Sequence, residues 1–215
     1  MMMTALLTQP AAAESFNFSL GGATTNVNVF ETAQTGRVFY NGVRRTAFGP
    51  ENGANFFFHR DTRDDTFSLL ILADQFEDGT RGSLFGQISG LPTTATITRS
   101  DDASELAITS PGVATFSFVF NTRGIDGGVI SGIDPASTNL AINFTSSTGL
   151  TSTNVIDSTG ITQLAGAPGP STTLFVAPNP EPSAWAFFIL SFVMVGTAAK
   201  RQRRTMTMLQ PVLAR

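Results

Sequence analysis

The sequence predicts an all-β fold, an antiparallel β-sandwich or jelly-roll, from three observations. Apolar and polar residues alternate over short runs, which is the period of a strand with one buried face. Glycine, proline, aspartate or serine interrupts these runs at intervals of about 10 residues. Between residues 15 and 165, no stretch keeps a helical period over three turns. Ten or so short strands with this spacing are typical of two packed sheets.

The first expected strand alternates Phe16, Phe18 and Leu20 with polar residues and ends at a glycine pair. Residues 37–40 are expected as a strand that turns at Asn41-Gly42, because Asn-Gly is the strongest short hairpin signal. Residues 66–73 form a continuous apolar run of strand length, so we expect that strand to be buried on both faces. The other expected strands are 27–29, 56–59, 83–89, 95–98, 105–109, 114–120, 128–131, 139–144 and 154–156.

Length and composition divide the chain into five segments. Its 215 residues suit one domain of about 150 residues with terminal extensions. The apolar start and the small residues before Glu14 indicate the remnant of a secretory signal peptide, with a disordered N-terminus as the alternative. We predict a signal remnant at 1–13, a β domain at 14–163, an extended Pro/Gly linker at 164–182, a transmembrane helix at 183–199 and a basic cytoplasmic tail at 200–215.

Charge is distributed unevenly along the chain. Residues 14–178 contain 8 arginines, no lysine and 15 acidic residues, a net charge of −7. Residues 200–215 contain 5 basic residues and no acidic ones. The acidic body argues against nucleic acid as a partner, whereas a basic cluster beside an apolar segment indicates membrane topology. Cysteine is absent, which excludes disulfides, thiolate zinc sites and a cysteine nucleophile.

The predicted transmembrane segment runs from Ser183 to Ala199 without a charge. As a helix it would span about 25 Å, near the short end of what crosses a bilayer. Trp185 suits the interfacial belt near one end. By the positive-inside rule, the basic end stays in the cytoplasm and the β domain lies outside the inner membrane. A buried helix of a soluble domain is the weaker alternative, because four stop-transfer cations follow the segment: Lys200, Arg201, Arg203 and Arg204.

The tripeptide Pro180-Glu181-Pro182, the apolar segment and the basic cluster follow one another near the C-terminus. This ordered triple resembles the PEP-CTERM sorting signal and covers residues 180–204 of the 215. The resemblance implies recognition by an exosortase, a membrane cysteine protease-transpeptidase that cuts near the tripeptide. It also implies a Gram-negative cell with an exopolysaccharide matrix. The 11 residues after Arg204 depart from the family pattern, and an uncleaved single-pass anchor is the competing outcome.

The β domain offers few residues for catalysis. His59 is the only histidine, and Asp61 or Asp64 would have to complete a Ser-His-Asp triad without any Gly-x-Ser-x-Gly elbow. We therefore expect His59 to be structural or solvated. Glycoside hydrolysis would need two facing carboxylates in a cleft, and the single tryptophan and single tyrosine argue against a sugar cleft.

Two acidic turns suggest calcium, which prefers hard oxygen ligands. Neither turn has the spaced Asp-x-Asp-x-Asp-Gly pattern, and solvated acidic turns are the ordinary explanation. The candidate ligands are Asp101, Asp102, Glu105 and Asp126.

These observations favour an exported, non-enzymatic surface or matrix protein with a structural or adhesive role. Its expected partners, implied by the resemblance, are an exosortase, the inner membrane before processing, and exopolysaccharide. A calcium-dependent carbohydrate-binding module is the first alternative, and calcium is the one cofactor considered. A secreted hydrolase with an unrecognised carboxylate pair is the second.

Overall fold

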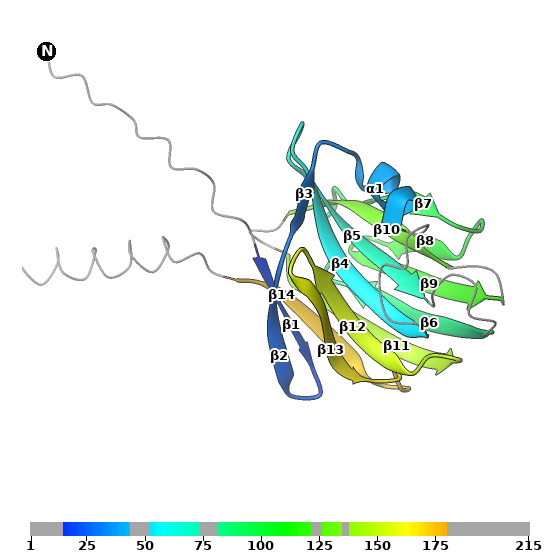
Figure 1. Ribbon diagram of the computed structural model, residues 1–215. Helices are drawn as coiled ribbons and strands as arrows, with labels where there is room; N and C mark the ends of the chain where they lie inside the picture. Colours follow the sequence, from blue (N-terminus) through cyan, green and yellow to red (C-terminus); the bar gives the residue numbers. More distant parts are fainter. Residues whose placement is uncertain (1–14, 44–51, 74–80, 122–125, 135–137, 180–215) are drawn as a thin grey trace, which may run out of the picture. The chain divides into compact units, whose positions relative to one another are not determined.

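The computed structural model describes residues 15–43, 52–73, 81–121, 126–134 and 138–179. These residues form two seven-stranded sheets and one short helix (Figure 1), so the predicted all-β class is confirmed. The predicted signal remnant, the Pro180-Glu181-Pro182 tripeptide, the transmembrane segment and the basic tail lie outside the described residues. Within the described ranges, no helix has the length and apolarity that crossing a bilayer requires.

The first sheet, called sheet A, is antiparallel at every strand pair. The alternation predicted its faces correctly, since Phe16, Phe18 and Leu20 are buried and the residues between them are partly exposed. Its strands, in spatial order, are β2 (Ala23–Asn28), β1 (Ser15–Leu20), β14 (Thr173–Pro178), β11 (Leu140–Thr148), β6 (Gly82–Ser89), β9 (Val113–Phe120) and β8 (Leu106–Ser110).

The second sheet, called sheet B, contains two parallel pairs, so the expectation of a purely antiparallel fold is wrong there. Strand β12 pairs with residues 53–56 of β4, and β3 pairs with residues 59–61 of the same strand. A parallel pair needs a crossover connection. Between β3 and β4 the chain forms helix α1 (Gly36–Val43). The strands are β13 (Gly160–Gly166), β12 (Ser152–Asp157), β4 (Gly53–Asp61), β5 (Thr66–Ala73), β10 (Asp126–Ile133) and β7 (Thr96–Ser100), in this order, with β3 (Phe30–Thr32) beside β4.

Helix α1 replaces the strand and Asn-Gly hairpin that the sequence predicted, and that prediction is wrong. Thr35 caps the helix, because its hydroxyl accepts a hydrogen bond from the backbone N–H of Val38 at 3.3 Å. Tyr40 and Val43, three positions apart, face sheet B and are buried. Gly36 allows the helix to approach the sheet closely, since a Cβ there would lie 2.5 Å from the hydroxyl of Ser68.

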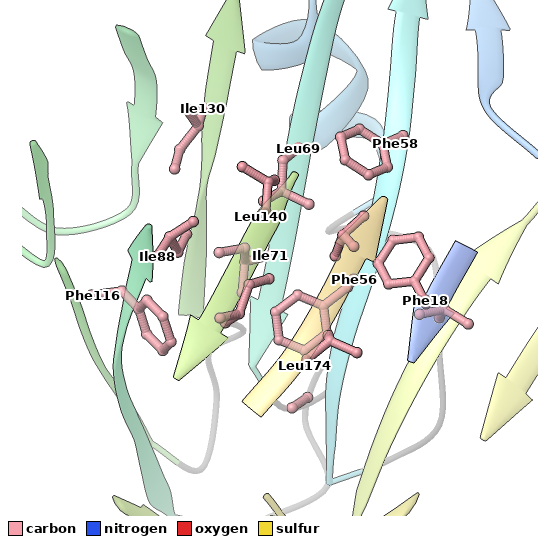
Figure 2. Packing of buried hydrophobic residues seen from close by; sticks show 14 of the residues in the cluster. Phe18, Phe56, Phe58, Leu69, Ile71, Ile88, Phe116, Ile130, Leu140 and Leu174 are labelled. Atoms are coloured by element: carbon pink, nitrogen blue, oxygen red, sulfur yellow. The ribbon is translucent and has the colours of Figure 1, made fainter. Parts of the chain in front are cut away.

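The main hydrophobic core lies between the two sheets, which face one another in a sandwich-like arrangement (Figure 2). Phe16 of sheet A stacks on Phe58 of sheet B, with ring centroids 3.9 Å apart and planes at 16°. Leu174 of sheet A and Leu69 and Ile71 of sheet B belong to the same cluster. Each fully buried side chain of this size contributes about 1.5–3 kcal/mol.

A second, smaller core lies on the opposite face of sheet B, beneath α1. Phe57, Leu70 and Leu72 point into it, and Tyr40 and Val43 of the helix close it. Alternate residues of β4 and β5 therefore serve different cores. Strand β5 is buried on both faces, as its continuous apolar run predicted.

Strand β14 contradicts the predicted linker at residues 164–182. It lies inside sheet A between β1 and β11, and Leu174 and Val176 are fully buried. The prolines do not prevent this pairing, because Pro178 is the last residue of the strand and the earlier prolines precede it. Strand β13 likewise continues to Gly166. The compact domain consequently extends to Asn179 rather than to residue 163.

Leu174→Ala tests whether β14 belongs to the core. Removing this buried side chain should lower the free energy of unfolding by about 2–5 kcal/mol, because a cavity remains in the core between the two sheets. Phe175→Ala is the matched control, since Phe175 is 57 % exposed on the same strand and its removal should cost less than about 1 kcal/mol. Chemical unfolding measures both values, and equal effects would place residues 173–178 outside the folded domain.

Candidate functional site

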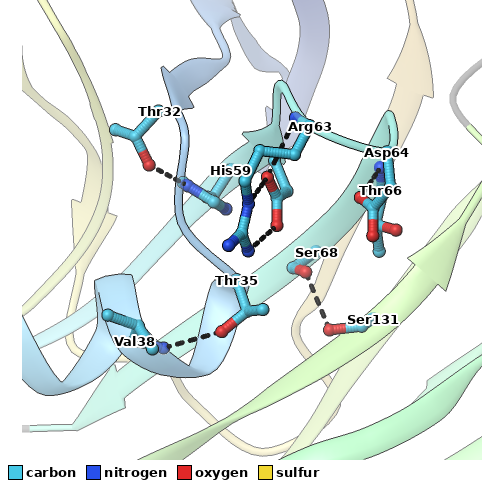
Figure 3. A network of polar contacts seen from close by, with 10 residues as sticks. Thr32, Thr35, Val38, His59, Arg63, Asp64, Thr66, Ser68 and Ser131 are labelled. Atoms are coloured by element: carbon cyan, nitrogen blue, oxygen red, sulfur yellow. Dashed lines mark hydrogen bonds and ion pairs between the residues drawn. The ribbon is translucent and has the colours of Figure 1, made fainter.

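Buried polar and charged side chains gather at two places in sheet B. The first place, here called the His59 cluster, lies near α1 and contains His59, Thr32, Asp61 and Arg63 (Figure 3). The second, here called the carboxylate corner, lies where the turn after β7 meets the start of β10. It contains the four residues that the sequence proposed as calcium ligands.

His59 is fully buried in β4. Its ring stacks on Phe39 of α1 with centroids 4.5 Å apart, and its Nε2 lies 2.7 Å from the hydroxyl of Thr32. Its Nδ1 has no hydrogen-bond partner among the described residues. Burial lowers the pKa of His59 to about 4, and the nearby charge of Asp61 opposes this shift only in part. The ring is therefore neutral at neutral pH and packs as a structural residue.

Asp61 lies two residues after His59 but is held by a different partner. Arg63 donates two side-chain hydrogen bonds to its oxygens, at 2.8 and 2.5 Å, and a backbone N–H at 3.0 Å. These bonds, chiefly those of the guanidinium, lower the pKa of Asp61 to about 2. Ser68 lies opposite His59 on the neighbouring strand, and its hydroxyl is hydrogen-bonded to the hydroxyl of Ser131 at 2.8 Å. The cluster therefore does not form a Ser-His-Asp triad.

In the carboxylate corner, Asp126 and Glu105 are directly hydrogen-bonded. Asp126 begins β10, is 5 % exposed, and accepts backbone N–H groups from Val119 at 2.7 Å and Gly127 at 2.8 Å. Glu105 ends the turn before β8 and is held there by its carbonyl, which accepts the N–H of Ser117 at 2.7 Å. Two carboxyl groups in contact cannot both be ionised without a large electrostatic cost, so they share a proton.

Burial, the hydrogen bond to Asp126 and the charge of Asp126 together raise the pKa of Glu105 to about 7. Burial also raises the pKa of Asp126, but the hydrogen bonds from Glu105, Val119 and Gly127 oppose that shift. Glu105 is therefore the proton donor of the pair below about pH 7, and Asp126 accepts its hydrogen bond.

Asp101 and Asp102 lie beside this pair, and the side chain of Asp101 is held by residues outside it. Asp101 accepts the hydroxyl of Tyr40 at 2.6 Å and the guanidinium of Arg99 at 2.9 Å. The backbone N–H of Asp102 donates to Glu105 at 3.3 Å. The sequence named these four acidic residues in two separate turns, and it missed Tyr40 and Arg99. Among the residues that the structure describes, no three His, Asp or Glu side chains are arranged to hold a metal ion, and calcium at this corner stays a prediction.

A shallow apolar hollow lies apart from both clusters, between the loop after β6 and the turn joining β8 to β9. No titratable side chain lines it, so it offers no acid or base that could activate its Ser and Thr hydroxyls. Its lining residues are Leu91, Pro92, Thr93, Ala95, Ile108, Thr109, Ser110, Pro111 and Gly112.

Comparison of the chain with protein-family models, with curated proteins and with solved structures found no match.

Glu105→Gln tests the shared proton. Glu105 binds its proton more tightly in the folded chain, so its contribution to stability is intact below about pH 4.5 and is lost as the pH rises through about 7. The amide introduced at position 105 would donate to Asp126 without titrating. The melting temperature of the variant should therefore fall less than that of the wild type between pH 5 and pH 8.

Asp64→Asn is the matched control for this measurement. Asp64 is exposed and accepts the N–H of Thr66 at 3.1 Å, a bond that asparagine preserves. It should keep the wild-type pH profile. Identical profiles for Glu105→Gln and the wild type would show that Glu105 does not hold a raised pKa.

His59→Gln should flatten the acid side of the stability profile. Because the pKa of His59 is lower in the folded chain, its contribution is intact above about pH 6.5 and is lost as the pH falls through about 4. Glutamine can still meet Thr32 but does not titrate. Thr32→Val is the control, since it removes the Nε2 partner and leaves the titrating ring. An equally steep loss in His59→Gln and the wild type would contradict the assignment.

Proposed function

We propose that this chain is an exported surface or matrix protein whose β domain is delivered by a C-terminal sorting signal of the PEP-CTERM type. In this proposal the domain is a β-sandwich, a signal peptide directs export, and residues 183–199 form one transmembrane helix in the inner membrane. An exosortase then cuts near Pro180-Glu181-Pro182. The delivered domain has a non-enzymatic, structural or adhesive role in an exopolysaccharide matrix.

The observation that carries the proposal is the position of the domain's end. The compact unit ends at Asn179, the residue immediately before Pro180. The backbone N–H of Asn179 donates to the carbonyl of Ser15 at 3.0 Å, and its side chain donates to the hydroxyl of Ser15 at 3.1 Å. Cleavage at the tripeptide would therefore leave every described strand and every described core residue in place, as a detachable signal requires.

The N-terminal end of the domain supports the same proposal. Strand β1 begins at Ser15, two residues after the small residues of the predicted signal cleavage site. Strand β1 pairs with β14, with Phe16 opposite Pro178. Both proposed cleavage points thus flank the folded domain without entering it.

The titratable groups support a non-enzymatic role over the hydrolase alternative. His59 and Asp61 are buried and occupied by structural partners. Glycoside hydrolases separate their two carboxyl groups by about 5–9.5 Å to admit the substrate or a water molecule. Glu105 and Asp126 instead contact each other directly. Their direct contact leaves no room between the two carboxyl groups for the sugar or the water molecule that glycoside hydrolysis requires.

Mass spectrometry of the mature protein from its native host tests the proposal. We expect a C-terminus at or near Pro180-Glu181-Pro182, because the exosortase would remove the residues after its cleavage point. Replacing Pro180 and Glu181 by alanine should leave the chain uncleaved while the domain still folds. A mature wild-type protein that still contains Trp185 to Arg215 would contradict the sorting proposal and leave a plain membrane anchor.

A further inference from the structure

The seven strands of sheet A, all of them described, contain no Asp, Glu, Lys, Arg or His residue. The domain as a whole is acidic, so its charges lie elsewhere. The strands of sheet B carry Glu31, His59, Arg60, Asp61, Arg99, Asp126 and Asp157. One of the two sheets is thus uncharged from edge to edge.

The outward face of sheet A presents hydroxyl and amide side chains in rows across neighbouring strands. The pairing registers align these residues directly, at the spacing of about 4.8 Å between strands. One row consists of Thr173, Asn143, Gln87 and Thr115. A second consists of Thr24, Ser19, Phe175, Ala141 and Ser89.

Hydrogen bonds between these side chains hold them in place. Asn26 donates to the side chains of Asn17 at 3.3 Å and Ser15 at 3.1 Å. The hydroxyls of Ser19 and Thr24 lie 2.8 Å apart. Thr173 donates to Asn143 at 2.6 Å. Such an array is ordered before any ligand arrives, which lowers the entropic cost of binding.

Phe175 provides an apolar platform within this polar face. It lies on β14, an inner strand, and is 57 % exposed. Its neighbours across the strands are the small residues Ser19 and Ala141, which leave the ring accessible. A pyranose ring combines an apolar C–H face with a rim of hydroxyl groups. An exposed aromatic ring among hydroxyls and amides matches both parts of such a ring.

The outward face of sheet B differs, because α1 covers part of it. The helix packs on β4, β5, β7 and β10 and seals the second core there. No described helix packs on sheet A. Sheet A is therefore the open face of the described domain.

We propose that the outward face of sheet A, centred on Phe175, binds a neutral polysaccharide. This inference rests on the proposed function and adds the site and the charge of the ligand. Uncharged side chains are covered at little desolvation cost, whereas buried charges without partners are costly. The strands offer no cation to pair with an acidic polymer, and the net charge of −7 over residues 14–178 repels one.

A second copy of the chain fits this face less well. Homodimer interfaces are more apolar than the average surface, with a contiguous apolar centre. The strongly exposed apolar residues of this face, Phe175 of β14 and Val119 of β9, are separated. Strands β11 and β6 stand between β14 and β9. The hydroxyl and amide side chains around these apolar residues favour a ligand that forms hydrogen bonds.

Affinity electrophoresis of the purified full chain tests the proposal, in gels containing dextran, galactomannan or alginate. We expect retardation in at least one neutral polymer and none in alginate, the polyanion. Retardation should persist with chelator and with added salt, because no metal or ion pair is involved. Phe175→Ala should weaken it about tenfold or more through loss of the platform. Gln87→Glu should do the same by placing a charge in the row.

Matched variants on sheet B control for stability and charge. Ile161→Ala removes an apolar side chain that is 50 % exposed, and Gln163→Glu makes the same amide-to-carboxylate change on β13. Both should bind as the wild type does. If neither neutral polymer retards the chain, the proposal is wrong. It is also wrong if Phe175→Ala and Gln87→Glu bind as the wild type does, or if binding needs calcium. Self-association abolished by Phe175→Ala would overturn it in favour of a second copy.

These outcomes are independent of the sorting test. A chain that is cleaved at the tripeptide but binds neither neutral polymer would remove the sheet A site and leave the sorting proposal intact. A chain that binds a neutral polymer but keeps residues 185–215 in the mature protein would remove the sorting proposal and leave the sheet A site intact.

Discussion

The contact between Phe16 of sheet A and Phe58 of sheet B is the constraint on which the rest of the fold depends. It joins the first strand of the described domain to β4, the strand that also meets β3, β5 and β12. Alternate residues of β4 serve two cores, with Phe58 between the sheets and Phe57 beneath α1. If β4 shifted its pairing by one residue, the side chains that face the main core and those that face α1 would change places, and His59 would enter the main core. The stacking of Phe16 on Phe58 therefore fixes the register of sheet B.

The strands of the two sheets contain different kinds of polar side chain. Sheet B takes ionisable groups into buried positions and neutralises each by a different means: an uncharged ring at His59, a guanidinium partner at Asp61 and a shared proton at Asp126. These groups make the stability of the domain fall toward both acid and alkaline pH. The strands of sheet A contain no ionisable group and gain order from hydrogen bonds between neutral side chains. The buried titratable groups described above thus belong to sheet B, whereas the neutral hydrogen-bonding surface belongs to sheet A.

Sequence reasoning succeeded where one residue type repeats with a clear period, as in β1 and β5. It failed at α1 because the Asn-Gly signal was given more weight than the Thr35 cap and the spacing of Tyr40 and Val43, although both signals were visible. It failed at β14 because prolines near the strand concealed the buried pair Leu174 and Val176. In the carboxylate corner, the acidic residues were visible in the sequence as two separate turns. Tyr40, however, meets Asp101 across 61 positions of sequence, and only tertiary packing brings the two together.

The bonds between Asn179 and Ser15 also have a mechanical consequence. Asn179 follows the end of β14, an inner strand that is hydrogen-bonded to β1 on one side and β11 on the other. Tension applied at Asn179 along the strand would load both ladders in shear, so many hydrogen bonds must yield together. An edge strand such as β2 or β8 could instead be unzipped one bond at a time. Because forced unfolding is governed by the rate of crossing the unfolding barrier, this attachment point suits a domain that must bear a pull at its C-terminal end.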